Sequence, residues 1–231
     1  MSIEVHVSTG VTTLTLSRPD RANAYDRATL QALDQAIAAV TTPVMVVQSA
    51  GERAFCGGAD LKELGEAHPS DALELYSQAV FERLGSHGAV SIAAVQGPAV
   101  AGGFELALAC DLRVCGPAAS FALPETALGL LPSAGGTTRL ADLVGPGRAR
   151  EVILAGRVID AETALQWGVA NRLAASPRTE AATWAAAIAQ RDPLALRLAK
   201  GVLDARQDRR PGLALERATE AVLYAARDDK N

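Results

Sequence analysis

Two glutamates stand alone in apolar sequence and are the first candidates for chemistry. Glu105 lies in GPAVAGGFELALAC (97–110), where every other residue is apolar or small, and Glu125 lies in the mostly apolar FALPETALGLLP (121–132). A lone charged side chain among apolar residues costs free energy unless it is paired or neutralised. Glu105 is therefore either at a surface or held inside for a purpose.

Two such acids are what proton addition and water activation at one substrate require, because burial raises the pKa of one carboxyl until it donates near neutral pH. A competing interpretation treats Glu125 as an ordinary acid at a helix start, after Pro124. Two isolated acids also do not by themselves establish a shared site.

Two glycine pairs precede runs of helical character. One pair (102–103) comes just before Glu105, and the other (57–58) precedes ADLKEL (59–64). The N–H groups at a helix start are unpaired and carry a partial positive charge, so such turns can hold a developing oxyanion. A side chain at Gly102 would then obstruct the ligand more than it disturbs folding. The alternative, that the glycines only allow close helix packing, has equal support from these residues.

Strand and helix patterns alternate over the first half of the chain. Alternating apolar residues predict a hairpin over 3–7 and 11–16, and apolar residues at helical spacing predict a helix over 26–40 with Asp26 as its cap. Further strands are expected at 44–47, 91–95 and 112–115, and helices at 71–84 and 102–110. Beyond Gly136 the pattern is helical, over 137–143, 148–154, 161–166, 179–190, 193–205 and 214–226. This order predicts one α/β domain, a layered or spiral core followed by a helical C-terminal part.

The bulk composition disfavours several classes of function. The 231 residues carry a formal net charge of −4 and a pI near 5.4, which gives no long-range attraction for nucleic acid or anionic lipid. The histidines are too scattered for a metal site, and GPAVAGG lacks the Lys-Ser/Thr ending of a phosphate-binding loop, so no metal or nucleotide cofactor is indicated. The cysteines form no CxxC pair, and the sequence has no signal-peptide pattern and no apolar run of membrane-spanning length. We therefore expect a cytoplasmic protein.

Taken together and in this order, these stretches resemble the enoyl-CoA hydratase/isomerase (crotonase) superfamily. The segment SRPDRANA (17–24) is similar to the family's Arg-Pro…Asn-Ala element, and SAGGTTRL (133–140) is similar to its Gly-Gly-Thr segment. The segment DAETA…WGVA (160–170) resembles the helix and strand that follow. The similarity covers nearly the whole chain, and its motifs occur in register.

The resemblance implies a crotonase-like spiral of ββα units over residues 1–175 and a C-terminal helical trimerisation region over 176–231, within one continuous domain. It implies an acyl-CoA thioester as substrate, no separate cofactor, and a homotrimer or a dimer of trimers. Carried over position by position, the backbone N–H groups of Ala59 and Gly102 would form the oxyanion hole. The residues that would line the CoA path are Arg21, Ala22, Ala24, Ala59, Asp60, Leu61 and Lys62.

Both acid positions of the hydratase branch are occupied, which favours syn addition of water to a 2-enoyl-CoA or the reverse dehydration. Glu105 would orient and activate the water, and Glu125 would protonate the α-carbon. Ser133 stands where hydratases often have a glycine whose N–H positions the water. The alternatives are an enoyl-CoA isomerase that uses Glu125 alone, and a non-catalytic crotonase-like scaffold or RNA-binding protein.

The given sequence stops at Asn231, where family members commonly continue into a helical segment over the CoA. We therefore expect a shortened C-terminal region and an open site, which could also admit a carrier-protein-bound acyl group.

Overall fold

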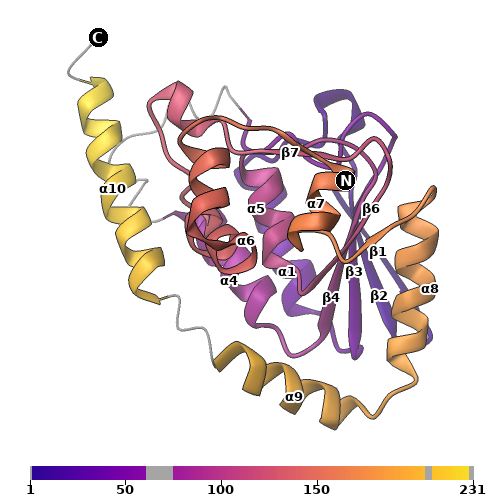
Figure 1. Ribbon diagram of the computed structural model, residues 1–231. Coiled ribbons are helices and arrows are strands. Elements are labelled where there is room, and N and C mark those ends of the chain that lie inside the picture. Colours follow the sequence, from indigo (N-terminus) through magenta and orange to yellow (C-terminus); the bar gives the residue numbers. More distant parts are fainter. Residues whose placement is uncertain (1, 61–74, 206–209, 229–231) are drawn as a thin grey trace.

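A six-stranded sheet forms the centre of the computed structural model, which describes residues 2–60, 75–205 and 210–228 (Figure 1). The strand order is β1-β2-β3-β4-β6-β9; only β1 and β2 pair antiparallel, as the predicted hairpin. The strands are β1 Ile3–Ser8, β2 Val11–Leu16, β3 Val44–Ser49, β4 Val90–Val95, β6 Leu112–Cys115 and β9 Arg172–Leu173. β3 and β4 are apolar and buried almost throughout, as parallel strands covered on both faces must be.

Helices cover the two faces of this sheet (Figure 1). One face is covered by α1 Arg27–Ala38, α4 Tyr76–Ser86 and α5 Gly102–Ala109, and α6 Gly136–Ile153 packs against α5. The opposite face is covered by α8 Pro177–Ala189, whose small residues Ala181 and Ala185 pack on Val44, Val46 and Ile92. Asp26 caps α1 as predicted, because its Oδ1 accepts the Thr29 N–H at 2.8 Å. The predicted helix over 71–84 is present from Tyr76, and residues 71–74 lie outside the described residues.

A second, small sheet was not predicted from the sequence. It consists of β5 Ala99–Val100, β7 Ser120–Ala122 and β8 Ile159–Asp160, which are too short to show a periodic pattern. The two helices predicted over 137–143 and 148–154 lie on either side of a break within α6, at Gly145 (φ 79°, ψ 160°) just before Pro146. The remaining short helices are η1 Pro19–Arg21, η2 Glu125–Leu128 and α7 Ala161–Trp167. The whole is the crotonase-like α/β spiral with a helical C-terminal part that the resemblance implies.

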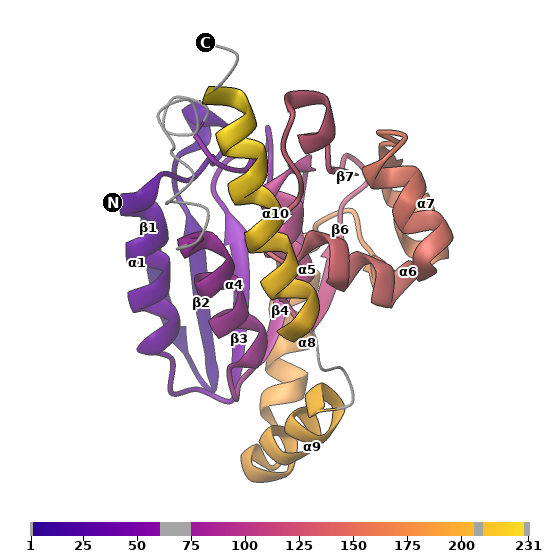
Figure 2. The same cartoon turned by 90° about the vertical axis from the view of Figure 1, so that its left-hand side faces the viewer.

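Two C-terminal helices continue from α8, namely α9 Pro193–Ala205 and α10 Arg210–Asp228. Figure 2 shows α10 crossing in front of α4 and α5, with α9 below the sheet. α9 is tied to the core by Lys200, which is ion-paired with Asp111 and donates to the Gly85 carbonyl at 2.8 Å. Its exposed face presents Leu194, Leu198 and Val202, which are four residues apart. Assembly through this region remains a prediction.

No helix in the described ranges is both long and apolar enough to cross a membrane.

Candidate active site

The segments around the two glycine pairs run side by side. Cys56 and Ala99 form a parallel bridge, and the Val100 N–H donates to the Cys56 carbonyl at 3.0 Å. Three residues further along each segment come Ala59 and Gly102, and both line one cavity. This register brings the two predicted oxyanion donors to the same place.

Backbone pairing leaves the Ala59 N–H unused. The Tyr25 N–H donates to the Gly58 carbonyl at 2.9 Å, and the Asp60 N–H donates to the Tyr25 carbonyl at 2.8 Å, so Ala59 lies in an extended segment rather than in a helical run. The N–H of a residue between two such bonds faces away from the partner strand. Among the described residues, no backbone carbonyl accepts from Ala59 or from Gly102, the first residue of α5. Both N–H groups are available to an oxygen in the cavity.

Glu105 lies in the first turn of α5 and is only 3% exposed. Its Oε1 accepts hydrogen bonds from the N–H groups of Ala134 and Gly136, each at 2.8 Å. Only glycine allows this approach at position 136, because a Cβ there would lie 2.8 Å from the same oxygen. Burial raises the pKa of Glu105 well above its ordinary value, and the charges of Glu125 and Glu216 raise it further. The sequence-predicted base is therefore buried, oriented by two donors and favoured as a proton acceptor.

Glu125 opens η2 and is 7% exposed. Within the described part of the chain, neither of its buried carboxyl oxygens has a hydrogen-bond partner. Burial is the main cause that raises its pKa to about 7, and the charge of Glu220 adds to this. A carboxyl group that holds a proton near neutral pH and faces a cavity can act as a general acid.

These groups share one cavity of about 320 Å³. It contains both acids, both candidate oxyanion donors and Ser133, the predicted water-positioning residue. Its apolar lining is supplied mainly by Leu75, Val100, Pro124, Leu128, Leu130 and Leu131. Two acids beside two free N–H groups can polarise a carbonyl while one carboxylate takes a proton and the other carboxyl gives one.

Comparison with known proteins decides the family. The family model described as Enoyl-CoA hydratase/isomerase matches residues 6–230. The chain belongs to the enoyl-CoA hydratase/isomerase family. It is 38% identical over 222 residues to the 2,3-dehydroadipyl-CoA hydratase of Escherichia coli, a match that covers 93% of this chain and 87% of that protein.

Two further relatives agree with this assignment. The carnitinyl-CoA dehydratase of Proteus mirabilis is 39% identical over 180 residues, which cover 75% of this chain and 69% of that enzyme. The crystal structure of an enoyl-CoA hydratase from Bacillus anthracis superposes with a TM-score of 0.85 at 35% identity, covering 97% and 92% of the two chains. This member of the enoyl-CoA hydratase/isomerase family is an enzyme of that class.

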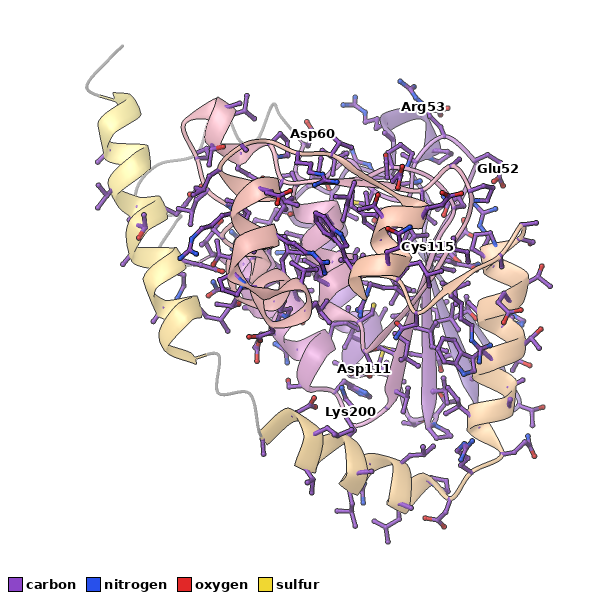
Figure 3. The ribbon with its side chains drawn as sticks, in the orientation of Figure 1. Glu52, Arg53, Asp60, Asp111, Cys115 and Lys200 are labelled. Atoms are coloured by element: carbon purple, nitrogen blue, oxygen red, sulfur yellow. The ribbon has the colours of Figure 1, made fainter. Side chains whose placement is uncertain are left out.

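Where the structure describes them, the predicted CoA-path residues of this family member lie near the candidate oxyanion donors Ala59 and Gly102. The Ala22 carbonyl accepts the Gly57 N–H at 2.9 Å, and the Arg21 guanidinium lies 3.4 Å from the Asp60 carboxylate. Figure 3 shows Asp60 at the end of the molecule opposite Lys200. Because the Asp60 carboxylate is ion-paired with Arg21, it offsets part of the positive charge that Arg21 brings to this edge of the cavity.

Arg18 stabilises the neighbouring turn, which includes Ala24 and Asp26. Its guanidinium donates to the Ala24 carbonyl at 2.7 Å and lies 2.9 Å from the Asp26 carboxylate. Leu61 and Lys62, also predicted for the CoA path, lie outside the described residues. CoA contact at all these positions stays a prediction.

Sequence reasoning missed Tyr25 and two glutamates of α10. Tyr25 lines the cavity, and burial followed by the charge of Glu105 raises its pKa well above the ordinary value. Glu216 and Glu220 belong to α10 and are each 2% exposed. The available signal was the spacing of two acids one helical turn apart in the sequence LERATEA (215–221), where a solvated face is the more usual interpretation.

The unpartnered Glu125 carboxyl predicts a stability effect. Its pKa is raised from 4.5 to about 7 in the folded chain, so the folded state loses stability relative to the unfolded state as pH rises between these values. Glu125→Gln removes this penalty. We expect the Tm of the variant to rise relative to wild type from acid pH up to about 7 and to hold that difference above it. Thermal unfolding across pH measures this, and a difference in Tm that does not change with pH would contradict it.

Proposed function

We propose that this protein is an enoyl-CoA hydratase, which adds water across the double bond of a 2-enoyl-CoA thioester or removes it in reverse. The observation that carries the proposal is the single cavity that contains two buried acids, Glu105 and Glu125, together with the free N–H groups of Ala59 and Gly102. The names of the relatives support the same class of reaction.

In the proposed reaction, Glu105 accepts a proton from water as the water oxygen bonds to the β-carbon. The electron pair of the double bond shifts to form a thioester enolate, whose oxygen is stabilised by the two N–H groups. Glu125 then gives its proton to the α-carbon. After the addition Glu105 holds the proton taken from water and Glu125 is ionised, so one proton passes from Glu105 to Glu125, directly or by exchange with solvent, before the next turnover. The proposed reaction uses no resident cofactor.

The isomerase alternative needs only one acid. Moving a double bond requires removal and return of a proton, which Glu125 alone could perform. The two N–H donors that fix the Glu105 carboxylate favour hydration, because a group held in one orientation suits the placement of a water. The non-catalytic alternatives have no use for an unpartnered buried carboxyl group, which costs stability.

The proposed substrate is an acyl-CoA thioester whose acyl chain contacts the leucines of the cavity, with CoA along the rim near Asp60. A homotrimer or dimer of trimers through the C-terminal helices is part of the same proposal. Carrier-protein-bound acyl groups are a second possible form of the thioester, since the chemistry at the carbonyl is the same.

The proposal is tested by product identity. The full chain is incubated with 2-enoyl-CoA esters of different chain length in ¹⁸O-labelled water, and the products are analysed by mass spectrometry. We expect a 3-hydroxyacyl-CoA that carries the label. Migration of the double bond without incorporation of label would establish the isomerase instead, and no conversion with any ester would refute both.

A further inference from the structure

The loop between η2 and α6 is held from outside by Glu216 of α10. The Glu216 Oε2 accepts the Gly135 N–H at 2.8 Å and the Gln78 side-chain amide at 3.2 Å, and its Oε1 accepts the Thr137 hydroxyl. Three successive N–H groups therefore alternate between two carboxylates: Ala134 and Gly136 donate to Glu105, and Gly135 donates to Glu216. The loop that orients the proposed base is fixed between α5 and α10.

Glu220 holds the other end of the same loop. One helical turn after Glu216, its Oε2 accepts the Leu131 N–H at 3.1 Å, and the residue lines the cavity with Glu125. Both α10 glutamates are 2% exposed. Burying two carboxylates of like charge on one helix is expensive, and a stable structure retains them only where the contacts compensate.

We infer that Glu216 and Glu220 are positioning residues of the active site, through which α10 fixes segment 131–137 beside the two proposed catalytic acids. Glu216 holds the part of this segment that donates hydrogen bonds to Glu105, and Glu220 holds the part beside Glu125. The inference rests on the proposed function for its kinetic consequences, but the hydrogen bonds on which it stands are independent of the reaction catalysed.

The charges around the four carboxyl groups support this pairing. Glu105 is faced by Glu125, by Glu216 and by Tyr25, and the Glu216 charge raises the pKa of Glu105. Glu125 is faced by Glu220, whose charge raises the pKa of Glu125, and by Tyr25.

Arg139 of α6 is a cation near the Glu216 carboxylate, and its charge acts to lower the pKa of Glu216. Its guanidinium also donates to the Ala134 carbonyl at 2.9 Å and to Glu82 at 2.7 Å. Burial outweighs Arg139 and the hydrogen bonds, so the pKa of Glu216 is raised overall.

The sign of each effect on the rate follows from the proton count. Hydration needs Glu105 ionised and Glu125 protonated. At the acid limit the rate is limited by ionisation of Glu105, so Glu216→Gln, which removes a negative charge beside it, raises kcat/KM relative to wild type there. At the alkaline limit the rate is limited by protonation of Glu125, so Glu220→Gln lowers kcat/KM there.

The experiment measures kcat/KM for hydration by the full chain at both pH limits, for wild type, Glu216→Gln, Glu220→Gln and the exposed control Glu162→Gln on α7. For each α10 variant we expect the ratio of its kcat/KM to the wild-type kcat/KM to change by at least about threefold between the acid and the alkaline end of the pH range. The ratio departs from one at the acid end for Glu216→Gln and at the alkaline end for Glu220→Gln. The ratio for Glu162→Gln stays constant. Glutamine keeps an acceptor for the loop N–H, so these variants isolate the charge.

Alanine variants isolate the hydrogen bonds. Glu216→Ala and Glu220→Ala release the loop and should lower kcat by about tenfold or more at every pH, with a smaller change in KM, because a loose base is poorly aligned with the water. Glutamine at the same position should restore most of the loss. If both glutamine variants keep a pH-independent ratio to wild type, or if the alanine variants retain wild-type kcat, the α10 glutamates are not positioning residues.

A measurement without turnover separates this inference from the proposed function. In ¹³C NMR titrations of glutamate carboxyl groups, with Glu105 and Glu125 assigned from their glutamine variants, Glu216→Gln should lower the pKa of Glu105 and Glu220→Gln that of Glu125. These shifts are expected even if the protein hydrates no enoyl-CoA. Unchanged titration curves in an active hydratase would overturn the inference alone.

Discussion

Glu105→Gln and Glu125→Gln should each lower kcat for hydration by at least ~10²-fold, since each removes general acid or base assistance that the proposed reaction needs. The amide introduced at position 105 can still accept the Ala134 and Gly136 N–H groups, so the loop keeps its place while the proton acceptor is lost. At position 125 the amide fills the volume of a carboxyl group that has no hydrogen-bond partner among the described residues.

Binding and product analysis separate this loss from unfolding. The Kd of each variant for a saturated acyl-CoA should stay near the wild-type value, and the Tm of Glu125→Gln should not fall near neutral pH. The control Glu162→Gln should retain wild-type kcat. If wild type and Glu105→Gln both move the double bond without adding water, and Glu125→Gln abolishes this migration, the protein is the isomerase and Glu105 is structural.

Strands β1, β2, β3, β4 and β6 of the main sheet and most helices were predictable because each has a pattern that depends only on local sequence, whereas the two-residue β9 has none. The alternation over 3–7 and 11–16 gives β1 and β2, and the apolar run from Val44 gives β3. The small sheet was not predictable, because its two- and three-residue strands are shorter than any period and are defined only by partners distant in the sequence. The break between the two helices predicted over 137–143 and 148–154 was predictable, because Gly145 and Pro146 normally end a helix, and the backbone inside α6 is non-helical at Gly145.

The two acids were predictable because each is the one charge in an apolar segment, and the structure brings both to one cavity. Their supports were not predictable. Glu216 lies 81 residues from Gly135, and Glu220 lies 89 residues from Leu131, so only the packing of α10 reveals these contacts. The extended pairing of Ala59 with Tyr25 was also missed, because a glycine pair predicts a helix start and an isolated bridge equally well.

Gly102→Ala should lower kcat/KM for hydration by ~10²–10³-fold, the range for loss of one oxyanion donor. The sequence alone suggested that a side chain here would obstruct the substrate. The structure places Tyr25 in its path instead: a Cβ at position 102 would overlap the Tyr25 Oη and lie 2.8 Å from the ring carbon that bears it. The Tyr25 ring packs edge-on against Phe81 at 5.8 Å between centroids, which opposes its retreat. We therefore expect the start of α5 to shift, which moves the N–H of residue 102 away from that of Ala59 and lowers the Tm.

A double variant distinguishes a displaced donor from a blocked site. Tyr25→Leu keeps an apolar side chain in the core but removes the hydroxyl and the outer ring atoms that the new Cβ would meet. If displacement is the cause, Tyr25→Leu/Gly102→Ala should regain most of the kcat/KM and the Tm lost in Gly102→Ala, since alanine keeps the backbone N–H and the helix start can return. The two substitutions are then strongly non-additive. If the losses in kcat/KM simply add while the Tm recovers, the methyl group itself meets the thioester, and Gly102 is required to admit the substrate rather than to make room for Tyr25.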